Sequence, residues 1–369
     1  MKRIMMIALV VAMLLGLCAC GTAEPSSTAA AKPVETASTA GEKPGETTAA
    51  ASQSPETTEA VTTEAAMTDV APEEPIELRV FSLKGPTSMG IATMLIDTEA
   101  VATYIHYVST VCAAADEVTA ALVIGDADVA MLPANAAAAL YNKTGGFSVV
   151  AINTLGVLYV VENGDTIHSI QDLAGKTVCM TGKGTTPEYA LRYLLAANGM
   201  EDQVTLEFKS EAQEVVAAMS EDVAMIGLLP QPFVTAATMQ NDQLRIALDL
   251  TQEWEAVSDG ASLVTGVTVV RNEILEQYPG VASLLISDCT DGVNNVNADP
   301  AFAAELIMNM GIVAKAPIAE RAIPYCNLVC ISGEEMKTLL SAYLQTLYDQ
   351  NPKAVGEKMP DDEFYYTGE

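Results

Sequence analysis

The sequence contains few of the residue types on which metalloproteins and nucleic-acid-binding proteins depend. Its 369 residues include two histidines, and 18 Lys and Arg stand against 48 Asp and Glu, for a net charge of −30. Nucleic-acid binding needs basic surface, so this balance argues against it. Neither His106 nor His168 lies near a cysteine or in the spacing of metal ligands. We therefore expect no transition-metal site.

The cysteines form no disulfide pattern. There are seven, of which Cys18 and Cys20 lie close to the start of the chain. An odd, scattered set is not a disulfide framework. Cys326 and Cys330 are four residues apart, a spacing that fits neither a redox pair nor a zinc knuckle. We interpret the remaining five as small, buried, apolar residues. They are Cys112, Cys179, Cys289, Cys326 and Cys330.

The sequence also lacks one nucleotide-binding motif, the P-loop, and one hydrolase motif, the nucleophile elbow. The stretch 175–195, GKTVCMTGKGTTPEYALRYLL, suggests a P-loop, but Ile170 and Thr177 occupy the positions where the leading glycine would stand. No Gly-x-Ser-x-Gly nucleophile elbow is present. What remains is a short strand, a Gly-rich turn and a helix that begins near Pro187. The free N–H groups of such a helix start can hold an anion or a polar ligand.

The first 75 residues are not expected to fold. Residues 1–20 combine Lys2, Arg3 and a long apolar run, as a secretion signal does. The ending Leu17-Cys18-Ala19-Cys20 resembles a bacterial lipoprotein signal, which implies cleavage before Cys20 and lipidation of its thiol; a plain signal peptide or an uncleaved anchor is the alternative. Residues 21–75 are mostly Thr, Ala, Ser, Glu and Pro, which predicts a disordered tether.

An internal repeat organises the rest of the chain, which is long enough for two lobes. Asp-Val-Ala-Met occurs at 128–131 and at 222–225, each time after a short helical pattern and before Leu-Pro. A strand, a Gly-rich turn and a helix open both halves, over 77–95 and 176–195. Strands that alternate with helices predict an α/β fold with mostly parallel sheets flanked by helices.

The repeat also predicts the site. Ligands of such sheets bind beyond the carboxyl ends of the strands, at helix starts, so four turns should surround one cleft. Trp254 stacks on a flat ligand or anchors the second lobe, and Lys183 reaches an anion or is a solvated loop residue. The candidate ligand-binding residues are Gly85, Thr87, Ser88, Pro133, Asn135, Gly184, Thr185, Thr186, Pro230, Gln231, Phe233 and Trp254.

Several motifs together resemble one family, the substrate-binding lipoproteins of ABC importers that bind nitrate, sulfonates, taurine or thiamine precursors. The motifs are GPTSMG (85–90), GDADVAMLPAN (125–135), NTLGVLYVV (153–161), SIQDLAGKTV (169–178), GKGTTPEYALRYLL (182–195), LLPQPFVT (228–235) and PDDEFYY (360–366). The resemblance implies a two-lobed clamp of the periplasmic-binding-protein type II fold. Lobe 1 would comprise residues 76–159 and 264–369, and lobe 2 residues 160–263.

The resemblance also implies a function without catalysis. A monomer, held at the outer face of the cell membrane by its lipid, would capture a small solute without a cofactor and deliver it to the permease and ATPase of an importer. The solute would be an anion or a small polar heterocycle such as a thiamine precursor, and the lack of arginine in the four turns favours a neutral ring. The alternatives are an enzyme similar to thiamine-pyrimidine synthases and a sensor lipoprotein without a transport role.

Overall fold

The computed structural model describes residues 75–96, 104–258 and 261–368, which all fall in the compact unit Thr68–Glu369. The predicted signal, Cys20 and all but the last residue of the predicted tether lie outside the described residues. Of the helices that the structure describes, none combines the length and the apolar character that crossing a membrane requires.

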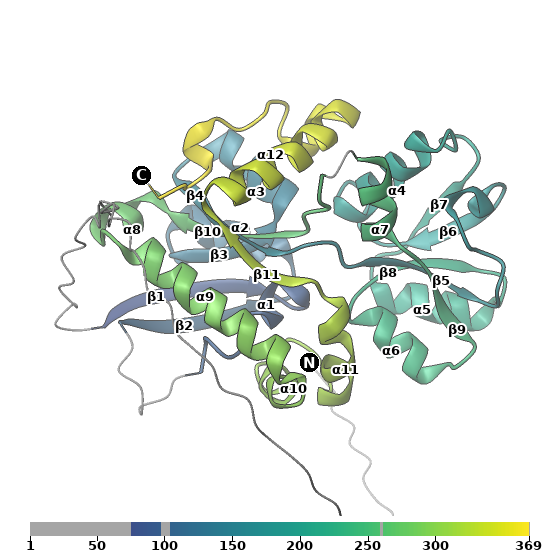
Figure 1. Ribbon diagram of the computed structural model, residues 1–369, viewed down its shortest axis with the longest axis horizontal. Coiled ribbons are helices and arrows are strands. Elements are labelled where there is room, and N and C mark those ends of the chain that lie inside the picture. The colour runs from purple at the N-terminus through teal and green to yellow at the C-terminus, as the bar shows by residue number, and fades with distance from the viewer. Residues whose placement is uncertain (1–74, 97–103, 259–260, 369) are drawn as a thin grey trace, which may run out of the picture. The chain divides into compact units, whose positions relative to one another are not determined.

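The first sheet has six strands in the order β11-β4-β10-β3-β1-β2 (Figure 1). Every residue of β4 is buried, as expected for a strand covered by helices on both faces. The strands are β1 (Ile76–Leu83), β2 (Ile105–Cys112), β3 (Val129–Pro133), β4 (Phe147–Thr154), β10 (Gly266–Arg271) and β11 (Leu328–Ser332).

The second sheet has five strands in the order β7-β6-β8-β5-β9. It is built from one continuous stretch of chain between β4 and β10. Its strands are β5 (Leu158–Asn163), β6 (Thr177–Met180), β7 (Thr205–Phe208), β8 (Ile226–Pro230) and β9 (Leu244–Asp249).

Both sheets are mixed, which corrects the expectation of mostly parallel sheets. β1 pairs in parallel with β2 and β3, and β6 with β7 and β8, as the strand–helix alternation predicts. The other five pairings, of β10 with β3 and β4, β11 with β4, and β5 with β8 and β9, are antiparallel. β5 and β10 are the strands by which the chain enters one sheet from the other, so no strand–helix–strand crossover fixes their direction.

Helices cover both faces of each sheet (Figure 1). On the first sheet, α3 and α12 pack into one hydrophobic cluster, and α8 and α9 into another on the opposite face. On the second sheet, α4 and α7 lie on one face, and α5 and α6 on the other. The helices are α1 (Pro86–Met89), α2 (Ala115–Ile124), α3 (Ala134–Thr144), α4 (Thr186–Ala197), α5 (Ala212–Glu221), α6 (Phe233–Gln240), α7 (Leu250–Val257), α8 (Asn272–Gln277), α9 (Val281–Ala298), α10 (Pro300–Asn309), α11 (Ala316–Ala322) and α12 (Gly333–Gln350), with 3-10 turns η1 (Ile170–Leu173), η2 (Ile323–Tyr325), η3 (Pro352–Val355) and η4 (Asp362–Phe364).

The two copies of Asp-Val-Ala-Met differ in structure. The first begins β3, as predicted, whereas the second precedes β8, which begins only at Ile226. Asp222 ends α5 and accepts a hydrogen bond from the N–H of Ala224 at 2.9 Å, and Val223 is 65% exposed. Residues 222–225 therefore lie before the strand rather than in it, because this aspartate turns the chain instead of joining the sheet.

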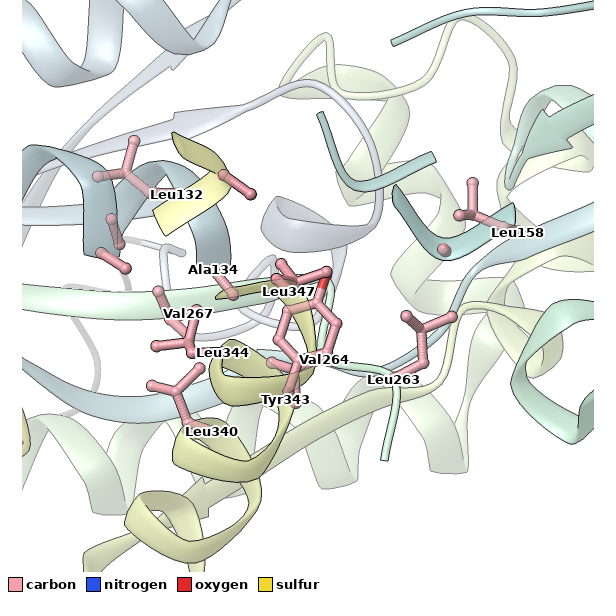
Figure 2. Close-up of a cluster of buried hydrophobic side chains, with 14 of the residues drawn as sticks. Leu132, Ala134, Leu158, Leu263, Val264, Val267, Leu340, Tyr343, Leu344 and Leu347 are labelled. Carbon is pink, nitrogen blue, oxygen red and sulfur yellow. The ribbon is translucent and has the colours of Figure 1, made fainter. Parts of the chain in front are cut away.

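Two chain segments connect the sheets and pair with each other. The N–H of Thr265 donates to the carbonyl of Thr154 at 3.0 Å, and Asn327 donates its side-chain amide to the carbonyl of Gly156 at 2.5 Å. Figure 2 shows Leu263 and Val264 of the returning segment beside Tyr343 of α12. One hydrophobic cluster thus runs from the first sheet through these segments into the second.

Candidate binding site

The turn before α1 uses part of its polar groups internally. Gly85 has a φ of 115°, a backbone conformation that favours glycine. The Ser88 hydroxyl is fully buried and donates to the carbonyl of Leu83. The Thr87 methyl lies so near Gly266 that a Cβ there would come within 2.6 Å of it. Of the three predicted residues of this turn, Ser88 therefore has its donor occupied.

The turn before α4 is likewise closed on itself. The N–H of Gly184 donates to Glu188 Oε2 at 2.7 Å, and the Thr185 hydroxyl donates to the carbonyl of Gly182 at 2.7 Å. Both residues are exposed, whereas Thr186 is only 4% exposed. Thr186 is the one of the three whose side chain reaches across to the first sheet's helices.

A hydrogen bond joins the starts of α4 and α3. The Thr186 hydroxyl donates to Asn135 Oδ1 at 3.2 Å, and Asn135 is 6% exposed. The hydroxyl of Tyr343 is fully buried and lies close to Thr186. Burial raises the pKa of Tyr343, and the neighbouring Thr186 partly opposes this. Two of the four turns that the sequence indicates are thus in contact, and Tyr343, to which the sequence gave no role, lies beside them.

Trp254 is completely buried in α7. Its ring packs against Tyr193, with centroids 4.3 Å apart, and against Tyr343 of α12 at 5.7 Å. Of the two interpretations left open by the sequence, the structure supports the anchor, because the rings on either side belong to the protein. Lys183 is exposed, with Nζ 5.7 Å from the centre of the Phe208 ring.

The turn before α6 is the most enclosed of the four. Gln231 is 1% exposed and accepts a 2.8 Å hydrogen bond from the Thr235 hydroxyl, but its amide nitrogen has no partner among the described residues. Pro230 ends β8 and Pro133 ends β3, and both are half-buried. Phe233 begins α6 and is partly exposed.

Two of the predicted turns border a cavity of about 520 Å³. Gly85 contributes one side, Pro232 and Phe233 another, and the loop before α11 a third. Apolar residues form much of the wall, and its two charged residues are Lys84 and Lys315. The full lining is Lys84, Gly85, Gln213, Pro232, Phe233, Ala236, Gln240, Gly311, Ile312, Val313, Ala314, Lys315 and Ile318.

The cavity's charge is opposite to that of the molecule. Neither Lys84 nor Lys315 makes an ion pair or a side-chain hydrogen bond with any residue in the described ranges, and no Asp or Glu lines the cavity. The chain has a net charge of −30, so the cavity is a local region of positive potential on a mostly negative molecule. The arrangement suits a small molecule with an anionic group and an apolar part.

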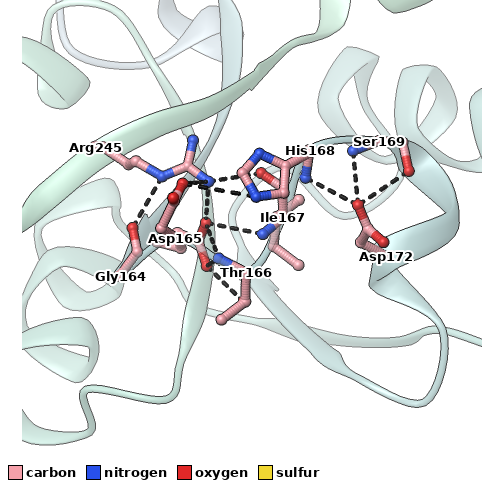
Figure 3. A network of polar contacts seen from close by, with 9 residues as sticks. Gly164, Asp165, Thr166, Ile167, His168, Ser169, Asp172 and Arg245 are labelled. Atoms are coloured by element: carbon pink, nitrogen blue, oxygen red, sulfur yellow. Dashed lines mark hydrogen bonds and ion pairs between the residues drawn. The ribbon is translucent and has the colours of Figure 1, made fainter.

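The histidines lie in structural settings away from this cavity. His168 is 61% exposed at its side chain and stands 3.6 Å from Asp165 in a network built around Arg245 (Figure 3). In that network, Glu162 accepts hydrogen bonds from the Thr166 and Ile167 N–H groups, each at 2.9 Å, and thereby fixes the loop after β5. His106 lies on β2, at the edge of the first sheet. No group of three or more potential metal ligands occurs within the described parts of the chain.

Comparisons with known proteins agree with this architecture. Residues 100–275 match the family model described as ABC transporter, phosphonate, periplasmic substrate-binding protein. Together with the two-sheet fold, the match supports an ABC-transporter substrate-binding protein of the sulfonate and nitrate type. No curated protein sequence gives a significant match.

Solved structures show that this chain has the periplasmic-binding-protein type II fold. An ABC transporter protein from Parabacteroides distasonis aligns with a TM-score of 0.69 and 22% identity, over 80% of this chain and all of the other. The aliphatic sulphonate binding protein SsuA of Escherichia coli aligns with a TM-score of 0.62 and 14% identity, over 80% and 95%. The nitrate-binding protein NrtA of Synechocystis PCC 6803 has a TM-score of 0.55 and 13% identity, over 75% and 82%. The predicted fold, family type and role as the solute-binding component are thus confirmed.

The sequence analysis missed the two cavity lysines. Lys84 directly precedes the predicted turn at Gly85, so a wider window around that turn would have included it. Lys315 lies in the loop after α10, outside all four turns and the repeat, and no local signal points to it. Only the packing of α11 beside α6 brings it to the cavity.

Proposed function

We propose that this protein captures a small organic anion in the cavity lined by Lys84, Lys315 and Phe233 and delivers it to an ABC permease. The observation that supports this ligand class is the pair of unpaired lysines in a cavity without carboxylates. It replaces the preference for a neutral ring, which rested on the lack of arginine in the four turns. The sequence also allowed an anion, and an anion fits this cavity better than a neutral ring does.

The shape of the cavity favours an anion with a hydrocarbon portion. Phe233, Ile312, Val313 and Ile318 offer apolar surface beside the two ammonium groups. A sulfonate or phosphonate with a short alkyl or aryl group would place its oxygens at the lysines and its carbon chain on this wall. The descriptions of the matching family and of SsuA, which name phosphonate and aliphatic sulphonate, belong to the same chemical class.

Capture would depend on two sets of elements. The cavity takes Phe233 from α6, on the second sheet, and Gly85 and Lys315 from elements of the first. A ligand that contacts both stabilises the arrangement in which they are close, which is a shift of population between open and closed forms. The closed form would be the one that the permease and its ATPase recognise. We include in the proposal the predicted lobes, 76–159 with 264–369 and 160–263, and the monomeric state.

The remaining predicted site residues keep supporting roles in the proposal. Thr87, Asn135, Thr186 and Gln231 are buried polar residues at the starts of helices around the junction of the sheets. They would hold these helix starts in place around the ligand. Lipidation of Cys20 would keep the protein at the outer face of the membrane. No catalytic step is part of the proposal.

The test is ligand binding by two lysine variants. Purified protein is first screened against alkyl and aryl sulfonates, phosphonates, nitrate and thiamine precursors by thermal shift, and the best ligand is then titrated calorimetrically. Lys84→Gln and Lys315→Gln should each weaken binding about tenfold or more, because a hydrogen bond to a charged group contributes ~1.5–3 kcal/mol. The melting temperature of the empty protein should stay the same.

Lys143→Gln is the matched control, since Lys143 is an exposed lysine in the last turn of α3 and does not line the cavity. Its affinity should equal that of the wild type. Unchanged binding in both cavity variants, or a best ligand that is a neutral ring, would show that the proposed ligand class is wrong.

A further inference from the structure

Two cysteines that are far apart in the sequence meet where α9 packs on β11. Cys289 lies on α9 and Cys330 on β11, and both contribute to the same hydrophobic cluster. Cys330 Sγ is 3.6 Å from the carbonyl oxygen of Ile286, one helical turn before Cys289. Cys289 Sγ lies 3.7 Å from the sulfur of Met94, and the two thiols are close enough for each to shift the pKa of the other.

The two thiols differ in accessibility and in acidity. Cys289 is 4% exposed, whereas Cys330 is half-buried on a strand at the edge of its sheet. The neighbouring Cys289 thiol lowers the pKa of Cys330 to about 7, and the same proximity, together with burial, raises the pKa of Cys289. Near neutral pH, Cys330 is therefore the better nucleophile of the pair, and it is the one that a reagent can reach.

We propose that Cys289 and Cys330 form a disulfide when the protein meets a thiol–disulfide oxidant. The Cys330 thiolate attacks one sulfur of the oxidant's disulfide, forms a mixed disulfide and releases the other sulfur as a thiolate. Cys289 then loses its proton and attacks the Cys330 sulfur, which forms the Cys289–Cys330 bond and releases the second thiolate. The two cysteines give up two electrons and two protons in total, and the oxidant is reduced to two thiols.

The disulfide would enclose a segment that matters for the cavity. Residues 290–329 lie between the two cysteines, and this stretch contains α10, α11 and the loop with Ile312 and Lys315. A cross-link at the two ends of this segment closes it into a loop. The loop has fewer open conformations than the free segment, so the segment moves less. The inference goes beyond the proposed ligand and does not depend on it.

The other described cysteines supply a control. Cys326, four residues from Cys330, is fully buried, and its sulfur lies 4.0 Å from that of Met89 in a different hydrophobic cluster from Cys289. Burial alone raises its pKa. Cys326 therefore has neither the thiol partner nor the acidity that the proposal requires, although any peptide map will place it on the same fragment as Cys330.

The experiment is a disulfide map of the full chain after incubation with oxidised glutathione. We expect a non-reducing tryptic digest to contain the peptide with Cys289 linked to the peptide with Cys330. The link should persist in Cys326→Ala and disappear in Cys289→Ala and in Cys330→Ser. The oxidised wild type should melt several degrees, about 5 °C, above its reduced form, and the Cys330→Ser variant should show no such difference.

Three results would overturn the inference. They are a wild-type map without the linked peptide although oxidant is in excess, a link that Cys326→Ala removes, and a Cys330 that reacts with glutathione but never passes the bond to Cys289. Alkylation of Cys330 in the folded, reduced wild type, measured before oxidation, reports accessibility without any substitution. A Cys330 that resists alkylation as strongly as Cys326 would equally count against the proposal.

Discussion

At the scale of single residues, Gly125 and Asp128 explain the motif GDADVA. Gly125 ends α2 with a φ of 84°, which favours glycine at this position. Asp128, 4% exposed, accepts hydrogen bonds at 2.7 and 2.9 Å from the Arg79 guanidinium and at 2.8 Å from Arg271. The clamp ties the start of β3 to β1 and β10, so the motif serves the fold.

Replacing Asp128 by Asn should destabilise the protein in a pH-dependent way. Burial by itself raises the pKa of Asp128, but the hydrogen bonds from Arg79 and Arg271 outweigh it and hold the pKa below its ordinary value. We expect Asp128→Asn to cost about 2–4 kcal/mol at pH 7, because two arginines lose their shared partner. A depressed pKa contributes stability above the unfolded-state pKa of ~3.9, and the contribution is lost as pH falls through the folded-state value.

Urea denaturation at pH 7 and at lower pH measures this effect. The gap between wild type and Asp128→Asn should narrow below about pH 4, where the carboxylate is protonated in the unfolded chain, and should close once pH has passed the lower folded-state pKa. Asp126→Asn is the control, since Asp126 is exposed two residues earlier. A gap that stays constant down to low pH would mean that the substitution acts through packing rather than through charge.

Residue-level prediction from the sequence depends on local chemistry. Gly85 and Phe233 stand at helix starts that follow strands, so the pattern alone indicates them. Lys315 lies in the loop before α11, and Tyr343 lies in α12. Lys315 reaches the cavity, and Tyr343 reaches Thr186, only through packing between parts of the chain that are more than a hundred residues apart. Trp254 stayed ambiguous because an aromatic ring suits a ligand and a core equally well.

At the scale of elements, the strand–helix order was predictable and strand direction was not. Periodicity and turn residues indicate β1, β3, β6 and β8 with the helices between them. The direction of β5 and β10 follows from the crossing between sheets, which leaves no trace in the local pattern. The contact between α3 and α4 is likewise a property of assembled elements.

The hydrogen bond between these helix starts should matter for ligand binding. Thr186→Val removes the donor to Asn135 but keeps the size of the side chain. Since the bond joins elements of both sheets, its loss should weaken their closed arrangement by about 0.5–1.5 kcal/mol, which lowers affinity roughly 2- to 12-fold. Calorimetry with the ligand from the screen measures this.

Thr185→Val is the matched control for that prediction, because the Thr185 hydroxyl is used within its own turn. It should leave affinity within twofold of the wild type. Equal losses in both variants would mean that the turn as a whole, rather than the contact with Asn135, determines binding.

At the scale of the whole molecule, charge separates the cavity from the rest of the surface. A net charge of −30 repels anions at long range, although salt screens this beyond ~8–10 Å. The two lysines act within that distance and so can select an anion that has already reached the cavity. The acidic surface would also keep the domain away from anionic lipid, which leaves attachment to the membrane to another part of the chain.

That part is predicted to be Cys20, and the prediction can be tested by location. We expect Cys20→Ala to move the protein from the membrane fraction to the soluble extracytoplasmic fraction, because the thiol that would carry the lipid is gone. Cys18→Ala is the matched control, since it alters the same apolar segment two residues earlier and should leave the protein with the membranes. Fractionation followed by immunoblotting measures both.

Two outcomes would contradict lipidation at Cys20. If Cys20→Ala stays with the membranes as Cys18→Ala does, an uncleaved apolar anchor holds the protein. If both variants and the wild type are soluble, residues 1–20 are a plain signal peptide, and binding to the importer alone keeps the protein at the cell surface.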